Sequence, residues 1–564
     1  MTSHARCSAT VLGLFLLPAT LLAPASELAA QDPDALHARV DSLFVAYNRT
    51  DSPGCALGVY RDGAIAYARG YGMADLEQGV AIGAHTVFDI GSTSKQFTAA
   101  ALALLEQDGL LSLDDDVREH VPELPDYGRP ITIRHLLNHT SGLRDYIGLM
   151  TMAGTDIDDV TGDDEALAAI ARQHALNFEP GAEWLYSNSG YFLASVIVER
   201  VSGRTLPEFA RERIFAPLGM RSTLFRDDYR LVIPQRASAY APEGDGTYAI
   251  DMSNWQQTGD GAVFTTVEDL LLWDRNFYEP RVGGRALLDA LHTRGRLSSG
   301  DTLEYALGLF IDEYRGARTV SHGGSWGGYR AELLRFPDER VSVAVLCNLA
   351  TTDPSTLAQR VADVYLADRL RAADGAVATS HAEHRAVTMS TAQLRRWTGT
   401  YQDSASGEVR RVVMRDSVLM LEAFGREWPL VPIADDEFRA DVPVDLTFRF
   451  DAGPPVRLHQ NLQGSSTTFR AIETVSPGVA ELRAYAGRFR SDELDATYEV
   501  RLEDDALQLV MPGSSPSRTL RPLQRDSFQA GTMVIRFQRS GGRISGFLLD
   551  QGRVRGLVFQ RTAQ

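Results

Sequence analysis

The sequence of 564 residues predicts an α/β (α+β) domain followed by two all-β, barrel-like domains. Strand-like hairpins flank a helix-rich and loop-rich middle in the first two thirds, whereas the last third has short alternating strands and an internal repeat. A segment rich in Ala, Ser and Thr, without periodicity, separates these two parts. The predicted boundaries are 1–30 for a signal segment, 31–372 for the α/β domain, 373–390 for the linker, and 391–475 and 476–564 for the two repeats.

The first thirty residues have the pattern of a secretory signal. His4 and Arg6 make a weakly basic start, an apolar run extends from Val11 to Leu22, and small residues follow. The run is too short to span a bilayer, and no later segment approaches the length of a membrane helix. We therefore expect an exported protein, periplasmic or extracellular, without a membrane span.

Composition and charge exclude some classes of function. The chain is 44% apolar and 23% charged, which is typical of a folded globular protein. Its formal net charge is −18, whereas a nucleic-acid-binding protein needs a basic surface. We therefore expect no nucleic-acid partner.

In the α/β part, the pattern predicts an antiparallel sheet that a C-terminal helix closes. Two apolar segments contain turn residues at their centres, Asp62-Gly63 in one and Pro337-Asp338 in the other. Helical periodicity flanks them. The predicted elements are a helix over 34–50, a hairpin over 55–72, the helix that follows Ser92, a hairpin over 329–350, and an amphipathic helix over 354–370.

The last third repeats itself at an offset of 88 residues. AQLRRWTGTY from Ala392 matches AELRAYAGRF from Ala480, with Gly399 and Gly487 in register. Each copy has the size of a small up-and-down barrel, which has no free sheet edges. One large β-sandwich is the alternative. Apolar positions that match at this offset are Val412, Met414, Leu419 and Leu421 with Val500, Leu502, Leu507 and Leu509.

Three cysteines occur in the chain. Cys7 belongs to the predicted signal. Cys55 and Cys347 lie in apolar, strand-like runs. An exported protein permits a disulfide, but we favour two buried thiols.

The first motif that indicates chemistry is Ser92-Thr93-Ser94-Lys95. Residues i and i+3 share a helix face, so the hydroxyl of Ser92 and the amine of Lys95 are expected to lie together. A neutral lysine can accept the serine proton, and this requires that burial or nearby positive charge lower its pKa from about 10.4. A capping serine beside a surface lysine is the plain alternative.

Two further motifs complete the predicted site. Tyr186-Ser187-Asn188 precedes an amphipathic helix; the phenol can relay a proton and the amide can bind a substrate carbonyl. His322-Gly323-Gly324 leads into a strand, where Gly324 lets a substrate lie against the main chain. The Ser325 N–H is expected to form an oxyanion hole with the Ser92 N–H.

These three motifs, in this order, resemble those of the serine β-lactamase and penicillin-binding-protein superfamily, in its class C-like branch. Other segments of residues 34–370 are similar to the family as well: LSLDDDV, ITIRHLLNHTSGL and GAVFTTVEDLLLW. The resemblance implies an antiparallel sheet flanked by helices, with a helical subdomain. It also implies that Ser92 is the nucleophile, with Lys95 and Tyr186 moving its proton.

The third motif departs from the usual one, because His322 stands where penicillin-recognising enzymes usually carry lysine. A histidine is only partly charged near neutral pH, which weakens the case for a β-lactamase or a D-Ala-D-Ala carboxypeptidase. A third motif that begins with histidine is similar to that of D-aminopeptidases and of some esterases of the same fold. The D-aminopeptidases also carry two C-terminal barrels. In them a barrel loop can reach the cleft. We identify no such loop here, and PGSSPSR from Pro512 is a candidate.

The expected protein is therefore a serine hydrolase that acts through an acyl-enzyme on Ser92. Asn188 and His322 are expected to position the substrate, which is a small molecule or a peptide. A peptidase or amidase of D-aminopeptidase type is the first choice. A short-chain esterase follows, then a weak β-lactamase or DD-carboxypeptidase. A catalytically silent protein that binds cell-wall peptides is the non-enzyme alternative. No metal or organic cofactor is expected, and the oligomeric state is left open.

Three other sequence patterns resemble parts of different sites: the nucleophile elbow of α/β-hydrolases, a zinc site and a calcium-binding loop. Ser325 lies in a G-x-S-x-G pattern, but the hairpin-like sequence after it lacks the helix that an α/β-hydrolase elbow requires. His135 and His139 have the i, i+4 spacing of zinc ligands without the glutamate, and a structural role is favoured. The aspartates 114–116 lack the order of a calcium loop and are interpreted as solvated acids at a helix start.

Overall fold

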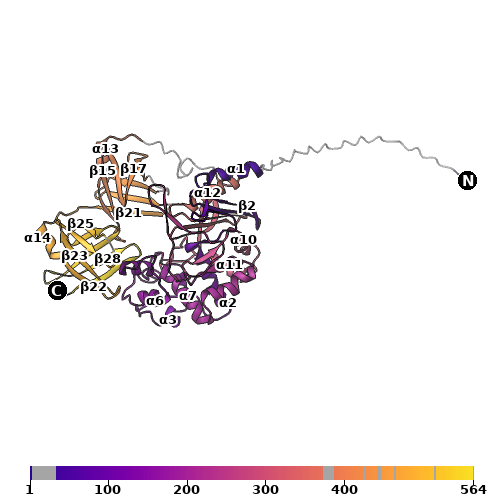
Figure 1. Cartoon of the computed structure of the whole chain (residues 1–564), viewed down its shortest axis with the longest axis horizontal. Coiled ribbons are helices and arrows are strands. Elements are labelled where there is room, and N and C mark those ends of the chain that lie inside the picture. The colour runs from indigo at the N-terminus through magenta and orange to yellow at the C-terminus, as the bar shows by residue number, and fades with distance from the viewer. Residues whose placement is uncertain are drawn as a thin grey trace.

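In the computed structural model of the chain, one α/β domain and two barrels are distinct (Figure 1). The structure describes residues 1–2, 33–371 and 387–562, apart from 405, 424–425, 441–445, 463–464 and 514–515. The predicted signal, beyond its first two residues, and most of the predicted linker lie outside the described residues.

The α/β domain is built on a six-stranded antiparallel sheet with the order β10-β11-β12-β13-β1-β2. Both predicted hairpins are present, with Asp62 and Gly63 in left-handed conformations at the first turn. The strands are β1 (Cys55–Arg61), β2 (Ala64–Tyr71), β10 (Phe310–Tyr314), β11 (Ala317–Trp326), β12 (Tyr329–Phe336) and β13 (Val341–Cys347).

Both faces of this sheet are buried, which explains why its central strands read as continuous apolar runs. Leu57 and Val59 pack into one cluster with α1 and α12, whereas Ala56 and Tyr60 belong to the main core on the other face. The helix α2 lies in that main core and packs against α7. The bounds of these helices are α1 (Pro33–Leu43), α2 (Lys95–Gln107), α7 (Asn188–Ser202), α10 (Val267–Asn276) and α12 (Pro354–Tyr365).

The middle of the α/β domain consists mainly of short elements. Its helices are η1 (Gly91–Ser94), α3 (Val117–His120), α4 (Ile133–Leu137), α5 (Tyr146–Ala153), α6 (Asp163–Ala171), α8 (Leu206–Ala210), η2 (Arg211–Phe215), α9 (Ala216–Leu218) and α11 (Gly284–His292). Its strands are β3 (Met73–Asp75), β4 (Val80–Ala81), β5 (Phe88–Asp89), β6 (Leu224–Phe225), β7 (Tyr240–Pro242), β8 (Tyr248–Ile250) and β9 (Val263–Thr265).

Each sequence repeat forms a closed antiparallel barrel, so the predicted fold class is confirmed and the single-sandwich alternative is wrong. Val412 and Leu421 are buried in the first barrel, as their repeat partners Val500 and Leu509 are in the second. A short helix precedes each barrel: α13 (Thr391–Arg395) and α14 (Val479–Leu482), the latter continued by η3 (Arg483–Tyr485). The first barrel comprises β14 (Gly399–Gln402), β15 (Val409–Arg415), β16 (Val418–Ala423), β17 (Arg426–Pro432), β18 (Glu437–Ala440), β19 (Leu446–Asp451), β20 (Arg457–Leu462) and β21 (Ser465–Ile472). The second comprises β22 (Gly487–Ser491), β23 (Ala496–Glu503), β24 (Ala506–Val510), β25 (Arg518–Gln524), β26 (Ser527–Ala530), β27 (Met533–Ser540), β28 (Arg543–Gln551) and β29 (Val554–Arg561).

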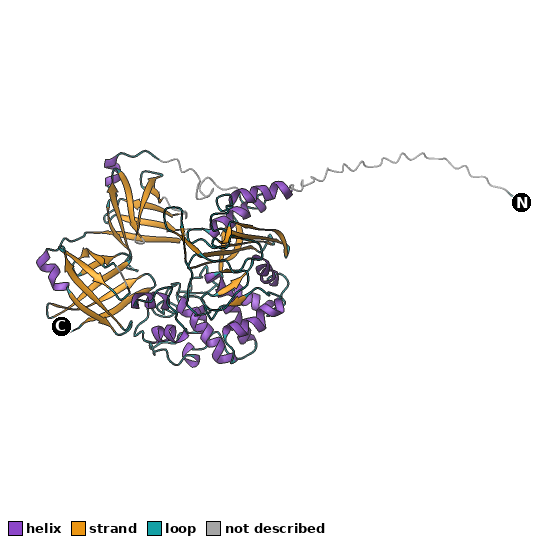
Figure 2. Cartoon of the chain, viewed as in Figure 1, coloured by secondary structure: helices purple, strands orange, loops and turns teal. Residues whose placement is uncertain are grey.

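The second barrel packs directly on the helical part of the α/β domain (Figure 2). Leu149 and Met152 of α5 join the apolar core of this barrel. Arg144 and Glu493 form a salt bridge of 2.6 Å across the interface, and both side chains are almost fully buried. Buried apolar and ionic contacts therefore hold the second barrel against the α/β domain.

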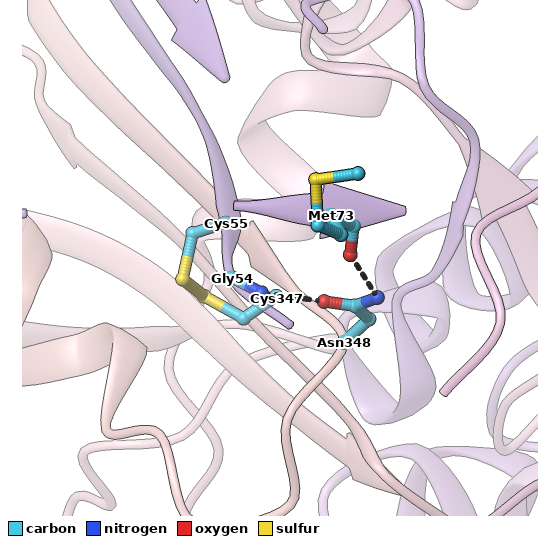
Figure 3. Close-up of a disulfide and its surroundings, with 5 residues drawn as sticks. All are labelled: Gly54, Cys55, Met73, Cys347 and Asn348. Atoms are coloured by element: carbon cyan, nitrogen blue, oxygen red, sulfur yellow. Dashed lines mark hydrogen bonds between the residues drawn. A yellow bond between two sulfur atoms is a disulfide. The ribbon is translucent and has the colours of Figure 1, made fainter. Parts of the chain in front are cut away.

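Cys55 and Cys347 form a disulfide (Figure 3), so the prediction of two buried thiols is wrong. The reason lies in the topology: β1 and β13 are antiparallel neighbours, and the two cysteines are directly opposite each other, with Cα atoms 4.0 Å apart. Next to the bond, the Asn348 side chain accepts a hydrogen bond from the Gly54 N–H and donates one to the Met73 carbonyl.

Among the described residues, no helix is both long enough and apolar enough to cross a membrane.

Candidate active site

Ser92 and Lys95 lie side by side at the start of α2. Ser92 belongs to the 3₁₀ turn η1, which continues without a break into α2 at Lys95. The Lys95 amine lies 3.1 Å from the Ser92 hydroxyl, and it also donates to the Asn188 side-chain oxygen (2.9 Å) and to the Asp260 carbonyl (2.6 Å). The structure therefore brings the first and second motifs together through one amine.

The environment of Lys95 favours its neutral form. The residue is fully buried, and it is the only lysine in the chain. Burial lowers its pKa well below the ordinary value; the charge of Arg553 acts in the same direction, whereas Asp260 and Asp145 oppose it. Burial also raises the pKa of the Asp260 carboxyl, which accepts hydrogen bonds from Tyr146. Both members of this buried pair are thus shifted toward their uncharged forms.

Tyr186 lines the pocket and contacts Lys95. Its ring lies 4.9 Å from the Lys95 amine and packs against the ring of His139, with centroids 4.1 Å apart. The phenol hydroxyl is buried and has no hydrogen-bond partner among the described residues. Burial raises the pKa of Tyr186, while the nearby Ser92 hydroxyl and the charge of Arg553 lower it. The hydroxyl is therefore protonated at neutral pH and available to a bound molecule.

The main chain around Ser92 abuts the third motif. A side chain at Gly324 would place its Cβ 1.8 Å from the Ile90 carbonyl, and one at Gly91, where φ is +49°, would lie 2.7 Å from the Ser325 nitrogen. Only glycine permits this approach. The Thr93 hydroxyl also donates to the His322 carbonyl. Ser92 and Ser325 therefore line the same pocket from two adjacent backbone segments, as an oxyanion hole requires.

His322 lines the pocket but differs from the partly charged group that we expected. Its Nδ1 donates to the Gly323 carbonyl, and its Nε2 accepts from the Tyr305 hydroxyl at 3.0 Å. Burial, together with the charge of Lys95, lowers the pKa of His322 to about 3. Both ring nitrogens form hydrogen bonds within the protein, and the ring is neutral. His322 therefore lines the pocket without bringing a positive charge to it.

Arg553 brings a positive charge to this pocket from the second barrel. It lies in the turn between β28 and β29, with its guanidinium 4.7 Å from the Tyr186 ring and 3.7 Å from the Asp145 carboxylate. The Arg553 carbonyl accepts a hydrogen bond from the Asn177 side chain, which holds the turn in place. Pro512 and Gly513 of the candidate loop lie instead against Gly154, outside the pocket, and Ser514 and Ser515 are outside the described residues.

The pocket at Ser92 has a volume of about 670 Å³, which suits a small molecule or the end of a peptide. One side of the pocket is formed by β11 from His322 onward. The pairing of β11 with β10 ends at Ser321, so this later part of β11 has no strand partner on the β10 side. An extended chain can lie along this free strand edge.

Comparisons with known proteins identify the family. A family model described as Beta-lactamase matches residues 40–367. The chain is 30% identical to penicillin-binding protein 4* of Bacillus subtilis (strain 168), over 71% of this chain and 91% of that protein. It is 27% identical to a D-aminopeptidase of Gluconobacter oxydans (strain 621H), over 94% of this chain and 99% of that protein. The solved structure of an octameric penicillin-binding protein homologue from Pyrococcus abyssi covers 78% of this chain and 100% of its own, with a TM-score of 0.56 and 24% identity.

The chain belongs to the beta-lactamase family. It is a serine hydrolase of this fold. The match to penicillin-binding protein 4* and the match to the D-aminopeptidase both extend beyond the α/β domain, because each covers more of the chain than residues 40–367.

The alternative motifs of this hydrolase have structural roles. Ser325 lies within β11, which turns directly into β12, so the helix of an α/β-hydrolase elbow is absent at this position. His135 accepts a hydrogen bond from the Thr132 N–H in a capping box of α4, and His139 accepts one from the Ser187 N–H. Asp116 caps α3 by accepting from the Arg118 N–H.

The three charged pocket residues that act on Lys95 were not predicted: Asp145, Asp260 and Arg553. Asp145 accepts a hydrogen bond from the Asn188 N–H at 2.8 Å and thereby fixes the start of α7. Asp260 directly precedes the family-like segment GAVFTTVEDLLLW, so that segment was a signal that Asp260 lies near the site. The fact that the chain has a single lysine was the clearest unused signal, because it sets Lys95 apart from 55 arginines.

Proposed function

We propose that this hydrolase is a peptidase or amidase of D-aminopeptidase type that acts through an acyl-enzyme on Ser92. The observation that carries the proposal is the fully buried Lys95, whose amine contacts the Ser92 hydroxyl within a pocket that Tyr186 also lines. Such a site can generate a nucleophile at neutral pH without an imidazole.

The reaction follows from these contacts. The Ser92 oxygen attacks the amide carbonyl while its proton passes to neutral Lys95, and the Ser92 and Ser325 N–H groups stabilise the oxyanion. The proton then passes by way of the Tyr186 hydroxyl to the leaving amine as the C–N bond breaks. Water attacks the ester and gives up a proton to Lys95, which passes it to the Ser92 oxygen as the ester C–O bond breaks. The acid is released, and neutral Lys95 and the Ser92 hydroxyl are restored. Asn188 holds the Lys95 amine and faces the substrate.

The choice of substrate rests on the relatives. The proteins named D-aminopeptidase match about the full length of the chain, barrels included. The neutral His322 supplies no cation for a carboxylate at the third motif, which argues against a β-lactamase-like substrate. Export belongs to the proposal as well: the signal pattern supports it, and so does the Cys55–Cys347 disulfide, since such bonds persist in oxidising compartments.

A panel of substrates tests the proposal. Wild type and Ser92→Ala are compared on D-alanyl and L-alanyl anilides, a short acyl ester, a chromogenic cephalosporin and a D-Ala-D-Ala peptide. We expect the D-alanyl anilide to be the best substrate, with kcat at least about 10⁴-fold lower in Ser92→Ala. Turnover of the ester alone would refute the peptidase assignment.

A covalent serine probe separates an enzyme from a silent binding protein. A fluorophosphonate should label wild type and leave Ser92→Ala unlabelled. If wild type stays unlabelled as well, the acyl-enzyme mechanism is wrong.

A further inference from the structure

A second cavity lies where the α/β domain and both barrels meet; we call it the junction cavity. It has a volume of about 890 Å³, larger than the Ser92 pocket. The α/β domain contributes Asp145 and Gly148, the first barrel contributes Arg426, and the second contributes Arg518 and Arg553. All three domains are therefore needed to form it.

The junction cavity is adjacent to the Ser92 pocket. Asp145 and Arg553 line both spaces. Arg553 is still 45% exposed at this boundary, although it contacts Tyr186 and Asp145. A chain that leaves the Ser92 pocket past Arg553 therefore enters the junction cavity.

The charges of the junction cavity leave two arginines unmatched. Each acidic residue in the lining has an arginine partner: Asp145 with Arg553, Glu408 with Arg410, Glu422 with Arg521 and Arg415, and Glu427 with Arg415. The guanidinium groups of Arg426 and Arg518, one from each barrel, line the cavity without an ion pair or a side-chain hydrogen bond to any described residue. Two free guanidinium groups in a chain of net charge −18 mark a place for an anion.

We propose that the junction cavity binds the carboxylate-bearing distal part of an extended peptide whose scissile amide lies at Ser92. Arg426 and Arg518 hold the carboxylates, and Arg553 lies along the path between the two spaces. That the ligand is a peptide substrate rests on the proposed function, whereas the anion site itself rests only on the cavity and its charges.

The test compares two peptides that differ only in charge: D-Ala-Gly-Gly-D-Glu-D-Glu with a free C-terminus, and D-Ala-Gly-Gly-D-Gln-D-Gln amide. Their dissociation constants are measured by calorimetry on full-length Ser92→Ala, which cannot turn them over. We expect the acidic peptide to bind about five- to tenfold more tightly at low salt, and the difference to shrink in 0.5 M NaCl.

Arginine variants locate the effect. In the Ser92→Ala background, Arg426→Gln/Arg518→Gln should reduce the acidic-to-neutral preference to about one. The matched control is Arg457→Gln/Arg488→Gln, which removes one exposed arginine from each barrel outside both cavities and should keep the full preference. The absence of a preference in the Ser92→Ala parent, or a preference that survives Arg426→Gln/Arg518→Gln, overturns the proposal.

The readouts keep the two proposals apart. If the preference depends on Arg426 and Arg518 but wild type hydrolyses no peptide, the anion site stands and the peptidase assignment fails. If wild type hydrolyses the D-alanyl anilide but no preference is found, the anion site alone fails.

Discussion

Lys95 combines three properties that a general base of this kind needs. It is buried, it contacts the Ser92 oxygen, and its other hydrogen bonds, to the Asn188 side chain and the Asp260 carbonyl, fix its direction. Lysine can lose its proton when burial lowers its pKa, whereas arginine stays protonated.

Substituting Lys95→Arg therefore tests whether proton loss matters. The variant keeps the charge of the protonated lysine but cannot accept the Ser92 proton, so we expect kcat to fall by about 10²–10⁴-fold. Thermal unfolding of the variant serves as the control for folding. A folded Lys95→Arg enzyme that retains activity within tenfold of wild type contradicts the role of Lys95 as base.

Arg553 should set the pH range in which the site works. Its positive charge lowers the pKa of Lys95, and its removal leaves the nearby Asp145 carboxylate without a cation. Both changes stabilise protonated Lys95, so in Arg553→Gln the pKa of Lys95 rises.

Because neutral Lys95 is the active form, the acid limb of kcat/KM should move to higher pH in Arg553→Gln. The measurement is the pH–rate profile of the two enzymes, with Arg553→Lys expected to restore part of the shift. An unchanged profile with only a higher KM would show that Arg553 binds substrate without tuning Lys95.

Among the residues of the pocket, the sequence was sufficient to predict those that lie together within one short motif. Ser92 and Lys95 are three positions apart, and helix geometry alone places them together. Asp260 and Arg553 reach the same pocket from 165 and 458 residues beyond Lys95, and no local pattern indicates such a meeting.

At the scale of elements, the turn between β28 and β29 depends on its contacts with the α/β domain. The buried Arg144 guanidinium bridges the Glu493 carboxylate and the carbonyls of Arg555 and Gly556. Removing one partner of a buried ion pair leaves the other charge uncompensated.

We therefore expect Arg144→Met to lower the free energy of unfolding of the docked structure by about 3–5 kcal/mol. Arg490→Gln in the second barrel is the matched control, because Arg490 and its partners Asp492 and Asp495 are exposed, and such pairs contribute about 0–1 kcal/mol each. Urea unfolding of both variants measures the difference. Equal losses in the two variants would contradict the importance of the buried pair.

The disulfide joins β1 to β13, two strands that lie at opposite ends of the α/β domain in sequence. Closing so long a loop reduces the entropy of the unfolded chain, and we expect reduction to lower stability by about 2–4 kcal/mol. Thermal unfolding with and without reductant measures this effect, and Cys55→Ser/Cys347→Ser should be insensitive to reductant. If wild type is equally insensitive, the bond does not support the fold.

Sequence patterns predicted the individual strands and helices better than they predicted which strands pair with each other. Asp62-Gly63 was sufficient to place the β1–β2 hairpin, because turn chemistry is local. The neighbour of β1 on its other side is β13, and that pairing depends on the complete sheet topology. The disulfide was missed for this reason.

At the scale of the whole molecule, the second barrel contributes Arg553 to the Ser92 pocket, and both barrels line the junction cavity. The repeat predicted two barrels because matched apolar positions share one offset, but it contained no information on how they dock. The docked position of the second barrel places Arg553 beside Tyr186, and the junction cavity forms where the barrels meet the α/β domain. Arg553 therefore lines both the Ser92 pocket and the cavity for which we propose peptide selectivity.

The pKa of Lys95 itself decides whether this residue can act as the base. Since the chain contains a single lysine, lysine labelled with ¹³C at its ε carbon gives one side-chain NMR signal, whose shift can be followed against pH. We expect this signal to titrate well below the ordinary lysine pKa of about 10.4 in folded wild type, and to return toward that value in urea. A folded protein whose signal titrates near 10.4 or above would contradict it, because Lys95 would then be charged at neutral pH and unable to accept the Ser92 proton.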